Sequence, residues 1–399
     1  MIPEDFHLEN RYYYSRLNTG EKDFYKFLVE LYLKRERKYT FAWKGDFIPD
    51  IPEVQALPSF VWGGYGEFVD FTKVHEAVNY DCPEFFYFCQ CGLSPKDDFS
   101  ITVGGDEPMY TDEEIDHLEG LLWGIYHNFD HITDPFELEL AIHDYITYNF
   151  DYDRDYEPME GVTYSGRDFE EIFTVAGLLK KGKGVCAAFA SLFQFVFQRR
   201  GYEVVYVVAD AGEEGDKSLH AWNAIKLGQN WYHLDVTWNE DNTLDNDFPQ
   251  YVFFNVTDEE IRADHDFKAE EYPEIVCNST EYNYYHKKGL YFTTHKEIRE
   301  GFGKFLEEHA HKEKNMHFYF RTPADFEEKV VSDALAREAK ERGFSLRQCL
   351  FTNYDGYFAI EIFPDVFPER EEKPASDATA AQGAPQGASA DTKPNEENK

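Results

Sequence analysis

Residues 182–197 read GKGVCAAFASLFQFVF, so glycines interrupt the chain just before a continuous apolar run. The large apolar residues of that run repeat at the spacing of a helix of about four turns in the centre of a core: Phe189, Leu192, Phe193 and Val196. Cys186 falls in the first turn, where unpaired N–H groups and the helix dipole favour a thiolate and can also receive an oxyanion. The stretch therefore predicts a rigidly held cysteine nucleophile.

Two strand-like runs follow at residues 219–227 and 231–238, and the sequence GQN at 228–230 separates them. This pattern is typical of a β-hairpin. With a two-residue turn, His220 and Asp235 share one face and lie diagonally, about 7 to 8 Å apart at the backbone. A three-residue turn would send them to opposite faces, so the register tests the functional interpretation.

The three side chains Cys186, His220 and Asp235 supply the parts of a nucleophilic active site. A polarisable thiolate attacks a carbonyl, an imidazole removes and returns the proton, and a carboxylate fixes the tautomer of the imidazole. We therefore expect these three residues to be catalytic.

The blocks around these residues resemble the signature blocks of the transglutaminase-like superfamily in order and spacing. They read GVC at 184–186, HAWN at 220–223 and WYHLDVTW at 231–238, and residues 251–265 further resemble bacterial members. The resemblance covers about residues 110–270. It implies a papain-like α+β fold, with the cysteine helix packed on an antiparallel sheet that bears His220 and Asp235. Members include crosslinking enzymes, peptidases, peptide N-glycanases and inactive scaffolds, so the family does not fix the reaction.

Composition and pattern divide the chain into four parts. Residues 1–105 read as a leading, mostly helical and loop-rich subdomain, and residues 106–272 as the transglutaminase-like domain, with helices starting near 112 and 135. Residues 273–367 read as a small α+β domain with a helix at 295–310, a strand at 317–321, a helix at 324–342 and strands after 345. Residues 368–399 have no aromatic residue, which predicts a disordered tail.

The charge balance limits the partners. There are 39 lysines and arginines against 77 acidic residues, a net charge of -38, and such a surface repels phosphate backbones and anionic headgroups. We therefore expect neither nucleic acid nor a membrane as partner. The chain shows no signal peptide and no long apolar span, which favours the cytoplasm; export from a processed start is the alternative. Six cysteines in 399 residues do not indicate a disulfide framework.

Several other residues invite a functional interpretation, and for each the structural one is favoured. The group Cys82, Cys89 and Cys91 has no fourth ligand at zinc spacing, so buried thiols are expected rather than a metal site. His143 is expected to be a hydrogen-bonded core residue, and His233 to be structural although it shares the strand face of Asp235. Three tryptophans are expected in the core rather than in a substrate groove: Trp222, Trp231 and Trp238.

The expected function is cysteine-dependent acyl transfer at an amide of a protein or peptide, without a cofactor. Cys186 would attack a peptide or glutamine carbonyl, an amine would leave, and water or another amine would resolve the thioester. Hydrolysis is favoured over crosslinking, because no evident calcium loop offers control over an acceptor amine. The alternative is a scaffold that keeps the fold and has lost turnover.

Overall fold

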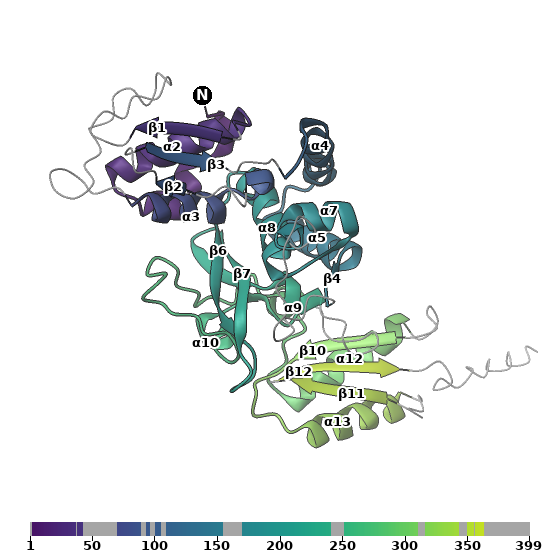
Figure 1. The fold of residues 1–399 in the computed structure, drawn as a ribbon. Coiled ribbons are helices and arrows are strands. Elements are labelled where there is room, and N and C mark those ends of the chain that lie inside the picture. Colours follow the sequence, from purple (N-terminus) through teal and green to yellow (C-terminus); the bar gives the residue numbers. More distant parts are fainter. Residues whose placement is uncertain are drawn as a thin grey trace, which may run out of the picture.

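The structure is a computed structural model, and it describes part of the chain in three successive portions (Figure 1). The described residues are 2–36, 38–42, 70–88, 93–95, 100–104, 109–154, 170–240, 251–309, 316–342, 349–354 and 356–362. The predicted tail, Cys89 and Cys91 lie outside these ranges. In none of the described segments is there a helix with the length and apolar character needed to span a membrane.

The first portion combines helices with a small sheet. Its helices are η1 (Glu4–Phe6), η2 (Leu8–Asn10), α1 (Tyr12–Ser15), α2 (Thr19–Leu33), α3 (Phe71–Asp81) and η3 (Pro83–Phe88). Helix α2 starts with a capping box between Asn18 and Glu21. The sheet has the order β1-β3-β2, from β1 (Lys38–Ala42), β2 (Leu93–Pro95) and β3 (Ser100–Gly104). The sequence predicted a mostly helical subdomain but not this sheet, whose short strands lie among proline-rich and glycine-rich stretches.

The central portion packs helices on one face of an antiparallel sheet. The helices are α4 (Asp112–Asn128), α5 (Pro135–Asn149), α7 (Val175–Lys181) and α8 (Cys186–Gln198). Helix α8 lies on strands β6 (Val204–Ala211) and β7 (Ser218–Leu227), and its apolar side chains are fully buried at the centre of the largest core cluster. A short parallel pair, β4 (Asp151–Tyr152) and β5 (Lys183–Gly184), precedes α8. Helices at 112 and 135 and the buried helix from Cys186 are confirmed.

The sheet has the strand order β6-β7-β8-β9, with β8 (Asn230–Leu234) and β9 (Phe254–Val256). Strands β7 and β8 are joined by the two-residue turn of the first alternative, since Leu227 pairs with Asn230 and Asn223 with Leu234. Gly228 has a φ of 61°, which the first position of such a turn requires.

The expected strand over residues 231–238 was too long. Strand β8 ends at Leu234, and residues Val236–Glu240 form the short helix α9. Asp235 stops the strand because its carboxylate Oδ1 accepts the backbone N–H groups of Thr237 (2.9 Å) and Trp238 (3.1 Å), as a helix N-cap does.

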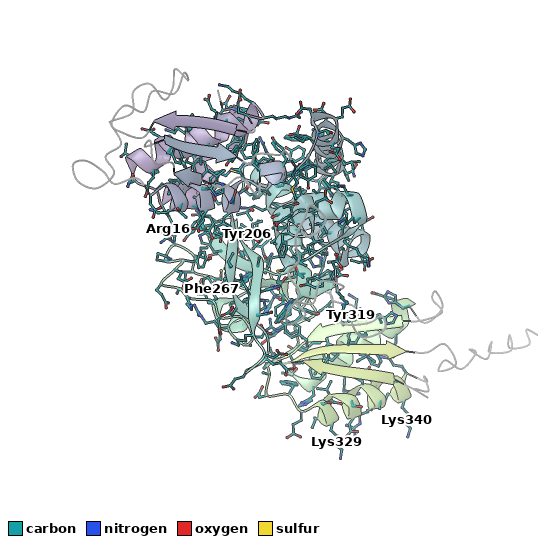
Figure 2. The ribbon with its side chains drawn as sticks, viewed as in Figure 1. Arg16, Tyr206, Phe267, Tyr319, Lys329 and Lys340 are labelled. Atoms are coloured by element: carbon teal, nitrogen blue, oxygen red, sulfur yellow. The ribbon has the colours of Figure 1, made fainter. Side chains whose placement is uncertain are left out.

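The last portion places two helices against one sheet (Figure 1). The sheet order is β10-β12-β11, from β10 (Met316–Arg321), β11 (Cys349–Tyr354) and β12 (Tyr357–Ile362). Helices α12 (His295–His309) and α13 (Glu328–Glu341) share an apolar core with the sheet, whereas Lys329 and Lys340 extend from the far side of α13 (Figure 2). The order helix, strand, helix, strands is as predicted, although α13 starts four residues later than expected. Helices α10 (Asp258–Ile261) and α11 (Tyr284–Lys287) connect this portion to the central one.

Candidate active site

Cys186 is the first residue of helix α8 and is half-buried. The first N–H groups of an α-helix have no acceptor within the helix, so the N–H groups of Cys186 and Ala187 are available to an oxyanion. Gly184 allows the chain to approach this point closely, because a Cβ there would lie 2.8 Å from the Cβ of Ala188. The start of α8 is thus fixed by tight packing around the cysteine.

His220 on β7 and Asp235 at the end of β8 meet, as the hairpin register predicts. The Nε2 of His220 lies 2.7 Å from Oδ2 of Asp235, and both side chains are buried. Asp235 thereby has two tasks, because Oδ1 caps helix α9 while Oδ2 faces the imidazole. The backbone bonds on Oδ1 fix the carboxylate, and the carboxylate in turn fixes the ring of His220.

The pairing shifts the pKa of both groups. Burial lowers the pKa of His220, but the charge and hydrogen bond of Asp235, together with interaction with Cys186, outweigh this and raise it to about 10. Burial raises the pKa of Asp235, yet the charge and hydrogen bond of His220 hold it well below its usual range. The pairing therefore favours the protonated form of the imidazole and the ionised form of the carboxylate.

The orientation of His220 also determines which ring nitrogen faces the thiol of Cys186. Nε2 donates to Asp235, so Nδ1 is the nitrogen left for the thiol of Cys186. Hydrogen bonding with Cys186 is among the causes that raise the pKa of His220, which places the thiol within reach of the ring. The structure thus brings all three predicted site residues together.

Aromatic residues from distant parts of the chain surround the site. The rings of Trp222 and Trp238 lie 6.2 Å and 5.5 Å from the ring of His220. Trp222 is a core residue as expected, whereas Trp238 is only partly buried and lies against the imidazole. On the other side, Cys186 packs with Tyr206 of β6 and Tyr80 of α3. Tyr206 lies where the first portion meets the sheet (Figure 2), so the leading subdomain contributes to the surroundings of the cysteine.

His265, which sequence reasoning did not single out, also reaches the site. Its Nε2 lies 3.1 Å from Oδ2 of Asp235, the same oxygen that faces His220, and its Nδ1 lies 2.5 Å from Oδ1 of Asp264. The ring is completely buried and packs 4.3 Å from the ring of Trp238. The signal available in the sequence was the Asp264-His265 pair at the end of the 251–265 stretch.

His143 and His233 have structural surroundings, as expected. His143 is fully buried and hydrogen-bonds to Asp144 and to Asn239. His233 accepts a hydrogen bond at Nδ1 from the indole N–H of Trp222 (3.2 Å), so its Nε2 carries the proton and donates it to Asp258 (3.0 Å).

Two groups of possible metal ligands occur among the described residues: His220 with Asp235 and His265, and His233 with Asp258 and Cys277. In the second group the Nε2 of His233 already carries a proton, because its Nδ1 accepts from Trp222, so that nitrogen has no lone pair for a metal. In the first group the Nε2 atoms of His220 and His265 both lie at hydrogen-bond distance from Oδ2 of Asp235. Cys82 is a buried thiol 3.2 Å from the hydroxyl of Tyr25.

Comparison with known proteins finds one family model that matches part of the chain. Residues 127–236 match the model of the transglutaminase-like superfamily, a range that contains all three predicted site residues. No curated protein matches the chain.

Three solved structures are similar to part of the chain. A crystal structure of a TGase shares 14% identity over 46% of this chain and 50% of its own, with a TM-score of 0.29. A protein from Cytophaga hutchinsonii, provisionally described as a cysteine protease, has 18% sequence identity over 37% of this chain and 61% of its own, with a TM-score of 0.22. The periplasmic domain of TgpA from Pseudomonas aeruginosa, bound to ethylmercury, has 17% sequence identity over 38% of this chain and 64% of its own, with a TM-score of 0.20. The chain thus spans less than two thirds of the length of each.

Proposed function

Because this chain contains a domain of the transglutaminase-like superfamily, with a papain-like α+β fold, we propose that it is a cysteine enzyme for acyl transfer at amides. Cys186 is the proposed nucleophile, His220 its base and acid, and Asp235 the residue that orients the imidazole. The observation that carries the proposal is the contact of a buried imidazole, oriented by Asp235, with a cysteine at a helix N-terminus.

The proposed reaction has two steps. The thiolate of Cys186 attacks the amide carbon, and the N–H groups at the start of α8 receive the charge on the oxygen. The imidazolium of His220 then gives its Nδ1 proton to the leaving nitrogen, so that an amine or ammonia departs and a thioester remains. In the second step His220 takes a proton from water, which attacks the thioester. A carboxylic acid leaves, and the thiolate of Cys186 and the imidazolium of His220 are restored.

The substrate class is a protein or peptide, and water is the proposed acceptor. Hydrolysis is favoured over crosslinking because the sequence has no evident calcium loop that could control an acceptor amine. A test incubates the full chain with glutamine-containing peptides and records three products. Ammonia reports attack on a glutamine side chain, new amino termini report peptide cleavage, and incorporation of a labelled amine reports crosslinking.

Each product must disappear in Cys186→Ala. The proposal expects cleavage or ammonia release without efficient incorporation of the amine. Incorporation that exceeds hydrolysis would reverse the preference for water. A lack of all three products, together with a Cys186 thiol no more reactive than the buried ones, would favour the scaffold interpretation instead.

A further inference from the structure

A second histidine shares the carboxylate that orients His220. His265 follows helix α10 and lies outside the range 127–236 that matches the family. Its ring is completely buried, with Nε2 3.1 Å from Oδ2 of Asp235 and Nδ1 2.5 Å from Oδ1 of Asp264. Both of its nitrogens therefore face carboxylate oxygens.

This geometry fixes the protonation of His265. A neutral imidazole has one N–H and one lone pair, whereas an ionised carboxylate only accepts hydrogen bonds. Asp235 remains ionised because it accepts two backbone N–H groups and the Nε2–H of His220. Both nitrogens of His265 are satisfied only if both carry a proton. Burial lowers the pKa of His265, but its bonds to Asp235 and Asp264 outweigh this and raise it.

We propose that His265 is a positioning residue, a buried imidazolium that completes the alternating chain Cys186, His220, Asp235, His265 and Asp264. This inference depends on the proposed function, because it assigns His265 a task in the same site. His265 and His220 compete for one oxygen of Asp235, and their ring centroids are 5.4 Å apart. The positive charge of His265 thus limits how strongly Asp235 holds the proton on His220, and it stabilises the thiolate side of the pair.

The surroundings of His265 contain few other charges. Among the described residues, the titratable groups that face it are His220 on β7, Asp235 after β8, Asp264 on its own segment and His233 on β8. His233 is held neutral by the indole N–H of Trp222. The remaining neighbours are aromatic rings: Trp222, Trp238 and Phe253. The charge of His265 therefore acts mainly on Asp235 and His220.

The first test compares the pH dependence of Cys186 alkylation by iodoacetamide in the wild type and in His265→Gln. The glutamine amide can still donate to Asp235 but carries no charge. Loss of this positive charge from the chain of groups that ends at Cys186 is expected to move the midpoint of the profile upward by up to about one pH unit. An unchanged midpoint in a folded His265→Gln protein would overturn the inference.

A second pair of variants tests the inference if His265→Gln does not fold. Asp264→Asn removes the charge that holds the second proton on His265. A negative charge is lost together with the positive one, so the midpoint is expected to move upward by less than in His265→Gln. Asp258→Asn is the matched control, because it makes the same change on the same segment but beside the neutral His233. Equal midpoints in Asp264→Asn and Asp258→Asn would contradict the inference.

The two proposals fail in different ways. If wild-type Cys186 reacts no faster than Cys82 and Cys277, the proposed function is wrong, and the role of His265 falls with it. The other case is that Cys186 is alkylated fast and in a His220-dependent way, but His265→Gln and Asp264→Asn do not move the midpoint of the pH profile. Then only the inference on His265 is wrong.

Discussion

Among the single residues of the site, Asp235 makes the contacts on which the others depend. Its Oδ1 caps helix α9 through two backbone N–H groups, and its Oδ2 meets the imidazole of His220. One carboxylate thus ties the end of β8, the start of α9 and the orientation of the base together. A residue with so many tasks is expected to tolerate very little change.

The first prediction concerns Asp235→Asn. The amide oxygen can still cap α9, but the amide nitrogen is a donor that faces Nε2 of His220. His220 must then carry its proton on Nδ1, the nitrogen that faces Cys186, which is the wrong tautomer for a base. We expect kcat/KM to fall by roughly 10²- to 10⁴-fold with little change in the far-UV circular dichroism spectrum. Wild-type activity in this variant would contradict the role of Asp235.

The second prediction follows from the raised pKa of His220. The unfolded imidazole titrates at about 6.5, and the folded one at about 10, so folding is favoured by the bound proton. This contribution is complete below about pH 6.5 and is lost as the pH rises through about 10. Urea denaturation at pH 6, 8 and 10 should show falling stability in the wild type and a weaker fall in His220→Gln. Parallel slopes in the two proteins would contradict the pairing.

The sequence predicted Cys186, His220 and Asp235 because each lies in a short stretch whose local structure can be predicted from its own residues. Cys186 follows glycines at a helix start, and the other two share one face of a hairpin with a two-residue turn. His265 could not be predicted in this way, because its approach to Asp235 depends on how the segment after β9 returns to the sheet. Its backbone pairs there with Ala211 of β6.

At the scale of elements, the start of helix α8 is set by close packing of Gly184. A Cβ at this position would lie 2.8 Å from the Cβ of Ala188 and 2.9 Å from Cδ2 of Leu178. The predicted strand over 231–238 was too long, because its aromatic and branched residues favour a strand but the carboxylate of Asp235 starts a helix. Strand propensity alone does not show that a side-chain carboxylate accepts the next backbone N–H groups.

The third prediction is that Gly184→Ala destabilises the fold by about 1 to 3 kcal/mol through overpacking. Activity should fall with it, because the displaced residue lies two positions before Cys186. Adding Ala188→Gly removes the nearest clashing atom, so the double variant should be more stable than the sum of the single effects predicts. Urea denaturation of the four proteins measures this coupling. Additive effects would show that the two residues do not share this contact.

At the scale of the whole molecule, the leading subdomain is tied to the central portion by buried polar bonds. Arg11 is almost fully buried; it pairs with Glu84 at 3.0 Å and donates to the side chain of Gln198 on α8. The hydroxyl of Tyr13 donates to the backbone of Tyr206, which packs with Cys186. The bonds to Gln198 and Tyr206 join residues almost two hundred positions apart. The sequence therefore predicted a mostly helical subdomain but not where it docks.

The fourth prediction tests this attachment with Arg11→Met, which leaves Glu84 with a single arginine, Arg199. Breaking a buried pair is expected to cost about 3 kcal/mol in the free energy of unfolding. Arg16→Met is the matched control, because its bond to Glu274 is largely exposed and is worth less than about 1 kcal/mol. Equal losses in the two variants would show that the buried network does not stabilise the molecule.

If Cys186 and His220 form a thiolate-imidazolium pair, the rate of Cys186 alkylation by iodoacetamide as a function of pH reports it. Mass spectrometry follows Cys186 beside the buried Cys82 and Cys277 in the wild type and in His220→Ala. We predict that Cys186 reacts fast well below pH 8 and that His220→Ala abolishes this reactivity. A Cys186 that reacts no faster than the buried thiols, or that reacts equally in both proteins, would contradict it.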